Sequence, residues 1–316
     1  MSTMGDIEDI IDQLKAMDLE TVSHYDVMAV MARIEKVMLF GFTLPVGSYV
    51  MRVRPNETAD CWGKWLHEEN ISYIRDPSIV APYNRASFDG DAMFYGCAGQ
   101  PDQFKEAVHV AYNEVSNLFN DPAYTSTEEH YVGGLWKVVA PINVIALVHH
   151  QTFTSKNERL KQLNEEYQQA VKQDPDMAKR SLRLSEFLAN DFAKPVPKNE
   201  GWQYKTSAAF ATHVKNLGID GLMYPSVKAD GDTSVFNVAL TPTSVDNKLK
   251  LREVSAVRVV KLSNGSVTPL PMLHDPNVSG RFLWQEYPVT FTSAMVECEI
   301  ERRERLGIPI PKREQR

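Results

Sequence analysis

The spacing of the apolar residues changes near residue 45, and this change constrains the fold more than any other feature of the chain. Before it, Ile7, Ile10, Ile11 and Leu14 recur at the three- and four-residue spacing of an amphipathic helix. After it, residues 48–54 alternate between two faces, as in a half-buried strand. The core of this chain must therefore be built from both helices and strands.

Residues 1–45 are predicted to form an N-terminal helical extension. A second apolar series at helical spacing comprises Met28, Met31, Ile34, Val37 and Met38. Because methionine commonly fills irregular gaps in protein cores, we interpret this series as core rather than as a binding surface. Residues 41–47, which include Pro45, mark the boundary with the region that follows.

Strands and helices alternate after this boundary. The first strand is expected to stop at Pro55, and residues 57–90 are rich in turn-forming residues, so they form a functional loop or contain short elements. Further strands are predicted at 92–97, 135–148 (two strands, or one bent at Pro141), 221–226, 235–240 and 249–262, and helices at 104–118, 155–193 and 206–217. Residues 263–316 contain six prolines and a short charged helix, and are predicted to be a C-terminal appendage.

The charge balance argues against general binding to nucleic-acid duplexes, although it leaves room for a local basic groove. The 316 residues contain 34 Lys and Arg against 41 Asp and Glu, which gives a net charge of −7. Neutralisation of phosphates dominates nucleic-acid affinity, so an acidic chain is not a general duplex binder. No direct nucleic-acid partner is expected.

Cysteine usage and hydropathy predict a soluble protein of a reducing compartment. Cys61, Cys97 and Cys298 are widely spaced and form no CxxC pair. The first ten residues are acidic where a signal peptide would be basic, and the longest apolar stretch, residues 138–148, is too short to span a bilayer. The sequence therefore predicts a cytoplasmic protein without a membrane partner.

The common catalytic and nucleotide-binding motifs are absent from the sequence. There is no GxxxxGK[ST], GxGxxG, HExxH or GxSxG. His67 lacks the second histidine of a helical zinc pair, and His149 and His150 are adjacent, so on a strand they would point to opposite faces. Asp89 and Asp91 are interpreted as turn residues. No metal site is predicted, and a bound nucleotide would have to be held by side chains.

Four sequence elements that carry arginine, glutamate and serine follow one another along the chain. They are the strand Tyr49-Val50-Met51-Arg52-Val53-Arg54, the segment Asn84-Arg85-Ala86-Ser87-Phe88 with Met93-Phe94-Tyr95-Gly96, the helix containing Glu106 and Ala111-Tyr112-Asn113-Glu114-Val115, and Gly218-Ile219-Asp220-Gly221-Leu222-Met223-Tyr224-Pro225-Ser226-Val227 with Asn237-Val238-Ala239-Leu240-Thr241-Pro242. The last element is the most specific of the four.

These elements resemble the RES domain, a family named for its arginine, glutamate and serine. The resemblance covers about residues 46–262, and the most specific likeness is to the family's "G-x-D-G-l-x-Y-P-S" and "N-x-A-L-x-P" patterns. It implies an α+β fold with a split, mostly antiparallel sheet of the ADP-ribosyltransferase type and flanking helices. It also implies a toxin of a toxin–antitoxin pair that degrades NAD+. NAD+ would then be a substrate rather than a resident cofactor, and an antitoxin protein would be the partner. The oligomeric state is not predicted.

The identity of the family's glutamate is open between two residues of one predicted helix. Glu114 keeps the family's "A-x-x-E-v" frame, whereas Glu106 fits the shorter spacing after Tyr95 that compact members show. The segment at Asn84 also departs from the family's "G-R-W/F-N" pattern. We prefer Glu114 because the residues around it match the frame.

The chemistry of NAD+ cleavage suggests a role for each candidate. The transition state resembles an oxocarbenium ion, which a carboxylate such as Glu114 would stabilise. Arg52 or Arg85 would hold phosphate bidentately, Tyr95 would stack on the pyridinium ring and Ser226 would position the substrate. The reserve candidates, which have equally good structural interpretations, are Arg54, Arg75, Tyr83 and Tyr224.

Two other functions are consistent with the same residues. An ADP-ribosyltransferase would use the same site and pass the ribosyl group to a protein, with Glu106 as a second acidic residue. A catalytically idle binding module would instead act through its helical extension and C-terminal appendage.

Overall fold

The described part of the chain divides into two units, each assembled from segments that are distant in sequence. The computed structural model describes residues 7–56, 64–121, 123–197, 199–228, 233–288 and 292–309, so Cys61 lies outside the described residues. The first unit comprises residues 1–51, 72–110 and 137–250, and the second comprises residues 52–71, 111–136 and 251–316. Each unit is considered by itself below.

The sheet of the first unit has the strand order β1–β7–β8–β9–β5–β2. The strands are β1 (Gly41–Leu44), β2 (Tyr49–Asn56), β5 (Phe94–Gly99), β7 (Ile142–Ala146), β8 (Gly221–Tyr224) and β9 (Phe236–Leu240). Only the β7–β8 pair among these neighbours is parallel. Parallel neighbours need a long crossover, and the segment between β7 and β8 supplies one that contains four α-helices, α6 to α9.

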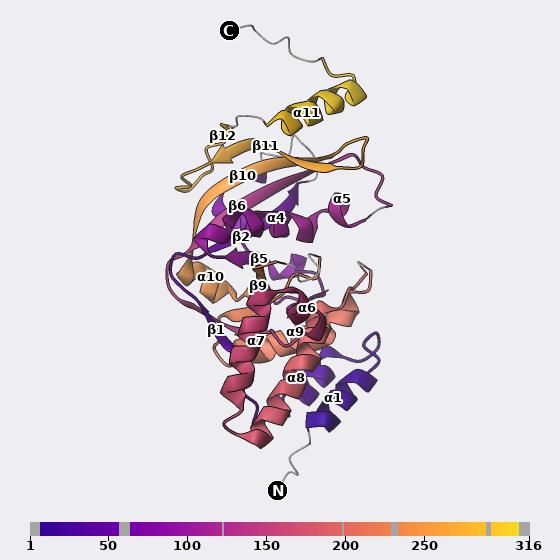
Figure 1. Cartoon of the computed structure of the whole chain (residues 1–316), viewed down its shortest axis with the longest axis vertical. Helices are drawn as coiled ribbons and strands as arrows, with labels where there is room; N and C mark the ends of the chain where they lie inside the picture. The colour runs from indigo at the N-terminus through magenta and orange to yellow at the C-terminus, as the bar shows by residue number, and fades with distance from the viewer. Residues whose placement is uncertain are drawn as a thin grey trace. The chain divides into compact units, whose positions relative to one another are not determined.

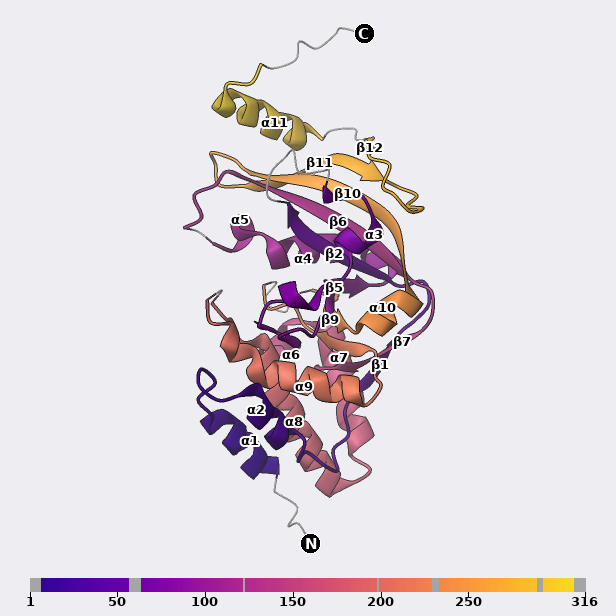
Figure 2. The ribbon, with the colours of Figure 1, turned by 180° about the vertical axis from the view of Figure 1, so that it is seen from behind.

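Helices pack around the apolar core of the first unit. They are α1 (Ile7–Ala16), α2 (His24–Met31), α6 (Gln151–Lys156), α7 (Glu158–Val171), α8 (Pro175–Ala193), α9 (Lys205–Asn216) and α10 (Pro242–Lys248). Figure 1 shows α1 beside α8, and the reverse view in Figure 2 shows α2 beside α9. Ile7, Ile10, Ile11 and Leu14 are all buried in this core, so the helical pattern predicted at the start of the chain is confirmed.

Short elements complete the first unit. They are the 3-10 turns Pro77–Ile79, Pro101–Gln103 and Gly201–Tyr204, and the small hairpin of β3 (Tyr83–Asn84) and β4 (Ser87–Phe88). The turn Pro77–Ile79 and the β3–β4 hairpin lie within residues 57–90, so the prediction that this stretch contains short elements is confirmed over its described residues.

The second unit has the strand order β2–β6–β10–β11–β12. Its elements are β6 (Glu128–Val138), β10 (Leu249–Lys261), β11 (Val267–Asp275), β12 (Gln285–Glu286), α3 (Glu68–Ile71), α5 (Asn117–Asn120) and α11 (Ser293–Leu306). Strands β2, β6 and β10 and helix α4 (Phe104–Val115) contribute residues to both units. Strands β10 and β11 pair antiparallel from Val254 opposite Asp275 to Lys261 opposite Val267.

A buried carboxylate organises one end of the second unit. Glu129 of β6 accepts hydrogen bonds from Ser116 Oγ (2.6 Å) and from the backbone N–H groups of Asn117 (3.2 Å) and Leu118 (3.3 Å). These backbone groups belong to the first turn of α5, where a carboxylate is favoured. Burial raises the pKa of Glu129, but the hydrogen bonds lower it by more, so the net pKa is below the ordinary value.

The predicted fold class is confirmed: the protein is α+β with a large, mostly antiparallel sheet. Residues 135–148 form parts of two strands, β6 and β7, rather than one bent strand. The expectation that Pro55 ends the first strand is wrong, because β2 continues to Asn56. Proline is tolerated near the end of a strand, where its missing N–H removes no essential ladder bond. Within the described residues, no helix is both long and apolar enough to cross a membrane.

Gly221 permits the close approach of β8 and β9. A Cβ atom built at this position would collide with the carbonyl oxygen of Ala239 and would lie 2.9 Å from Leu240 Cα. Both of these are backbone atoms of the neighbouring strand, which a rotamer change cannot move. Any side chain here would push β8 away from β9.

We predict that Gly221→Ala destabilises the protein by about 3 kcal/mol, because overpacking against backbone cannot be relieved locally. Gly41→Ala is the matched control, since a Cβ at that strand position meets nothing within 4 Å. Urea unfolding of both variants measures the difference. Equal midpoints for the two variants would contradict the close approach at Gly221.

Candidate functional site

The Gly218–Ser226 element owes its shape to the carboxylate of Asp220. This carboxylate accepts hydrogen bonds from Asn143 N (2.6 Å), Lys248 Nζ (2.6 and 2.8 Å) and Ser244 Oγ. Burial raises the pKa of Asp220, but the contacts with Lys248, Ser244 and Asn143 lower it more, so the net pKa is below the ordinary value. The anchored loop leads directly into β8.

Polar residues gather where β8 ends and β9 begins, beside β5. Tyr224 is the Cα partner of Asn237, and Asn237 is in turn the partner of Cys97. Asn237 is buried, and Ser226, which follows β8 after Pro225, is fully buried. Burying polar side chains is costly unless they are hydrogen-bonded, so their concentration here marks the place as a candidate site.

Tyr95 lies on β5 with its hydroxyl held by the β3–β4 hairpin. Ala86 N–H donates to the Tyr95 hydroxyl at 3.1 Å, and the hydroxyls of Ser87 and Tyr95 are 3.0 Å apart. The ring is half-buried and packs against the core of the first unit. These contacts fix the direction of the ring, as stacking on a substrate would require.

Arg85 contacts the C-terminal end of α8. Its guanidinium donates hydrogen bonds to the carbonyl oxygens of Phe192 and Lys194 (3.3 Å for the nearer Lys194 bond), and its Cζ lies 5.0 Å from the centroid of the Tyr204 ring. The last carbonyl groups of a helix lack partners within it and carry partial negative charge, so a cation is favoured there. This contact gives Arg85 a structural role in addition to the phosphate role predicted from the sequence.

Asp191 is a buried carboxylate near Arg85. Its Oδ1 lies 2.5 Å from Lys194 Nζ, and burial raises its pKa although the charges of Lys194 and Arg85 act in the opposite direction. Opposite charges thus compensate one another around the end of α8, which reduces the positive potential available to a phosphate there.

The two predicted arginines of β2 belong to the second unit. Arg52 is buried, with only 8% of its surface exposed. Arg54 donates a hydrogen bond from Nη1 to the carbonyl of Asn70 (3.2 Å) and lies 5.9 Å from the Trp65 ring centroid, and burial lowers its pKa. Arg54 is therefore held by structural contacts within this unit.

The two competing glutamates of α4 lie in different units. Glu114 is half-buried on the last turn of α4 and belongs to the second unit, as Arg52 does. Glu106, on the first turn, belongs to the first unit and accepts hydrogen bonds from Ser234 N (2.7 Å) and Ser234 Oγ. Burial raises the pKa of Glu106, but hydrogen bonds from Ser234 and Thr233 lower it more. Glu106 thus anchors the segment that leads into β9.

The other reserve candidates make structural contacts. Arg75 and Tyr73 both contact the carboxylate of Asp246, at 3.2 and 2.8 Å. Tyr224 packs against Phe192, with 5.4 Å between the ring centroids. Tyr83 lies beneath Lys205 Nζ, which is 5.2 Å from its ring centroid.

Asp91, which was expected in a turn, and the adjacent His149 and His150, which were not expected to bind a metal, also have defined contacts. Asp91 Oδ1 lies 2.5 Å from Lys215 Nζ. His150 caps α6 by accepting a hydrogen bond from Phe153 N (3.2 Å), and His149 Nδ1 lies 2.7 Å from Asn164 Oδ1. Among the described residues, no group of three or more His, Cys, Asp or Glu side chains is arranged to hold a metal ion.

The sequence reasoning missed two residues at the candidate site. Asn237 is one of them, and its neighbour across the β8–β9 pair is Tyr224. Asp220 is the other. The signals were a polar residue inside the otherwise apolar segment Phe236–Leu240 for Asn237, and an aspartate directly before the apolar segment Gly221–Tyr224 for Asp220.

These observations define an α+β protein with buried polar residues at one end of a mostly antiparallel sheet. No protein-family model matches the chain, and no curated protein matches its sequence. A solved structure with a similar arrangement is the crystal structure of the M. tuberculosis MbcT–MbcA toxin–antitoxin complex. The match has 10% sequence identity and a TM-score of 0.34, and it covers 80% of this chain and 92% of the other.

We predict that Arg85→Ala destabilises the protein by about 2 kcal/mol, because hydrogen bonds from a charged group to the end of α8 are lost. Arg75→Ala is the control, since the exposed Arg75–Asp246 pair contributes at most about 1 kcal/mol. Thermal unfolding without any ligand measures both effects. If Arg85→Ala unfolds at the wild-type temperature, the contact with α8 is not stabilising.

Proposed function

We propose that this protein is an enzyme that consumes NAD+ by cleaving the bond between nicotinamide and ribose. The observation that carries the proposal is the Asp220-anchored element, which ends in the fully buried Ser226 beside the polar residues where β8 ends and β9 begins. This element is also the one in which the sequence most resembles the RES family. The contacts of Asp220 and the close approach at Gly221 explain why the family pattern has an aspartate and a glycine here, which supports the resemblance.

The reaction needs a carboxylate near the ribose more than it needs a strong acid. Positive charge spreads over the ribose ring as the bond breaks, and a fixed negative charge stabilises that state. Nicotinamide leaves readily because it is cationic while attached. In this proposal Glu114 stabilises the developing charge, and water takes the place of nicotinamide on the ribose.

The other proposed residues bind the rest of the substrate. Arg52 holds the pyrophosphate, since a guanidinium matches phosphate oxygens with two parallel hydrogen bonds. Tyr95, whose hydroxyl is held by Ala86 and Ser87, stacks on the nicotinamide ring. Ser226 positions the substrate by hydrogen bonding.

Glu106 and Glu114 are given different roles in this proposal. The carboxylate of Glu106 is bound to the backbone and hydroxyl of Ser234, so a structural role accounts for it fully. Glu114 also keeps the sequence frame of the family. The two residues therefore make different predictions for stability and for turnover.

In cells, the proposed enzyme acts as the toxin of a toxin–antitoxin pair. An enzyme that destroys a central cofactor must be held inactive by a partner, and an antitoxin protein would provide that control. Transfer of ADP-ribose to a protein is the alternative outcome of the same cleavage, with an amino-acid side chain in place of water.

We predict that the purified full chain converts NAD+ to nicotinamide and ADP-ribose, and that its expression in a bacterial host lowers cellular NAD+ and slows growth. Chromatography of the reaction over time follows both products. Nicotinamide release with ADP-ribose bound to protein would indicate the transferase. Folded protein that leaves NAD+ intact both in the tube and in the host would contradict the proposal.

We predict that Glu114→Gln lowers turnover by about 10²–10³-fold, because the negative charge facing the oxocarbenium is removed while the shape is kept. Glu106→Gln should instead keep turnover and lower the unfolding temperature, since the contacts with Ser234 weaken. Initial rates and thermal unfolding of both variants separate chemistry from stability. The reverse pattern would assign the catalytic role to Glu106.

A further inference from the structure

Helix α11 of the second unit has clear local start and stop signals. Thr292 caps its first turn by accepting a hydrogen bond from Met295 N (3.3 Å), and Gly307 ends it in the left-handed conformation, with φ of 65°. The helix has 14 residues, and isolated helices of this length are marginal in water. Its position must therefore depend on contacts with the rest of the unit.

The apolar contact of α11 is small. Cys298 and Arg302 are the buried residues of the helix, and Cys298 joins only Val260 of β10 and Leu270 of β11 in a buried apolar cluster. Leu262 and Met295 pack at its margin. Leu306, near the end of the helix, is 48% exposed, so only part of the apolar surface of the helix contacts the strands.

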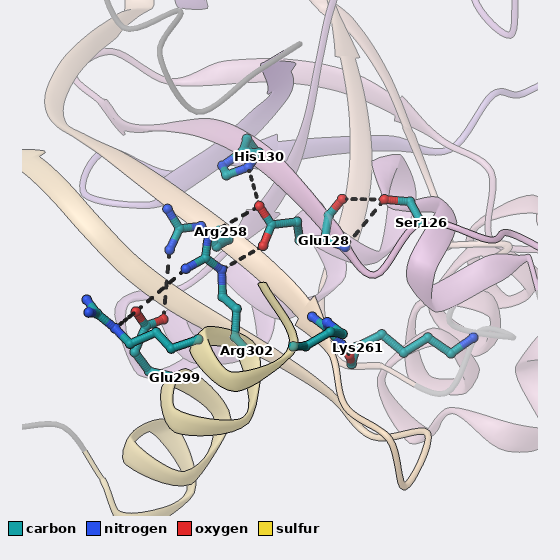
Figure 3. Close-up of polar contacts among 9 residues, drawn as sticks. Ser126, Glu128, His130, Arg258, Lys261, Glu299 and Arg302 are labelled. Carbon is teal, nitrogen blue, oxygen red and sulfur yellow. Dashed lines mark hydrogen bonds and ion pairs between the residues drawn. The ribbon is translucent and has the colours of Figure 1, made fainter. Parts of the chain in front are cut away.

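Charged groups supply the larger set of contacts (Figure 3). Arg302 Nε lies 2.6 Å from Glu128 Oε2 and Arg302 Nη2 lies 3.4 Å from Glu128 Oε1, and the Arg302 side chain is only 9% exposed. Glu128 Oε1 also lies 3.3 Å from His130 Nε2. On the same side, Glu299 of α11 lies 3.8 Å from Arg258 of β10.

Backbone contacts connect the helix to the end of β10. Glu301 accepts a hydrogen bond from Ser263 N (2.5 Å), and Arg305 donates one to the carbonyl oxygen of Lys261 (2.9 Å). These bonds can be replaced by water when the helix moves away, because both residue pairs are exposed. The Arg302–Glu128 pair is less accessible to water, since 9% of the Arg302 side chain and 24% of the Glu128 side chain are exposed.

We propose that α11 is a displaceable strap. The helix moves away from β10 and β11 as one rigid segment, while the rest of the second unit stays folded. The Arg302–Glu128 pair is the latch. Removing Arg302 abolishes its two hydrogen bonds to Glu128 and its contact with Glu299 at 3.6 Å, so fewer contacts hold the helix and its release becomes easier. Opening uncovers Cys298 and the apolar residues Val260 and Leu270.

The thiol of Cys298 reports on the opening. It is fully buried in the closed state, and burial, with the negative charges of Glu299 and Glu301, raises its pKa. Both effects suppress alkylation until the strap opens. Cys97 is buried in the first unit and serves as an internal reference for unfolding there.

The test compares Arg302→Met, Glu128→Gln and wild type in the full chain by iodoacetamide labelling, read for each cysteine by peptide mass. We expect Cys298 to label at least about 10-fold faster in Arg302→Met, because hydrogen bonds between charged groups are lost, with Cys97 unchanged. Glu297→Gln, which removes an exposed charge from the same helix, should label as wild type does. Glu128→Gln should resemble Arg302→Met.

Two outcomes would overturn the proposal. If Cys298 labels in Arg302→Met at the wild-type rate, the pair does not hold the helix. If Cys298 and Cys97 accelerate together in Arg302→Met, the substitution unfolds the protein as a whole and α11 is not a separate strap. Arg302→Met changes a residue of α11 alone and leaves β6 intact. Both outcomes can therefore be read from this variant even if Glu128→Gln fails to fold.

Discussion

The first unit depends on the carboxylate of Asp220. One side chain contacts the backbone at the start of β7, a hydroxyl in α10 and the ammonium group of Lys248 at the end of that helix. Because these segments are far apart in sequence, their meeting at Asp220 sets where β8 begins. Gly221, the next residue, then lets β8 approach the backbone of β9. The place of the polar residues where β8 ends and β9 begins follows from this arrangement.

The second unit uses two neighbouring glutamates of β6 in different ways. Successive residues of a strand point to opposite faces, so Glu128 and Glu129 serve different helices. Glu129 caps the first turn of α5 through backbone N–H groups, whereas Glu128 pairs with a buried arginine of α11. A carboxylate bound to backbone amides stabilises local structure. A carboxylate paired with a distant arginine makes the position of a helix depend on one ion pair.

Two of the candidate residues make long-range structural contacts. Arg85 and Glu106 both matched expected family positions, yet the first binds carbonyl groups at the end of α8 and the second binds Ser234. Neither contact follows from local sequence, because the partners lie more than 100 residues away. Arg52, Tyr95, Glu114 and Ser226 remain the proposed substrate-binding and catalytic residues.

Local sequence patterns were enough to predict the kinds of elements and several of their ends. The periodicity of apolar residues predicted helix α1, strand β2 and the strands in the C-terminal half, because local spacing decides which backbone conformation buries a face. The second predicted helix was too long, since α2 ends at Met31 and Ile34, Val37 and Met38 lie beyond it. The Gly-x-Asp-Gly pattern likewise singled out the loop before β8. Which charges meet follows from the three-dimensional arrangement of the elements. Arg302 and Glu128 are 174 residues apart, and Arg85 and Phe192 are 107 apart. The pairing of such distant groups depends on how the strands and helices are arranged in space, which no local pattern of residues encodes.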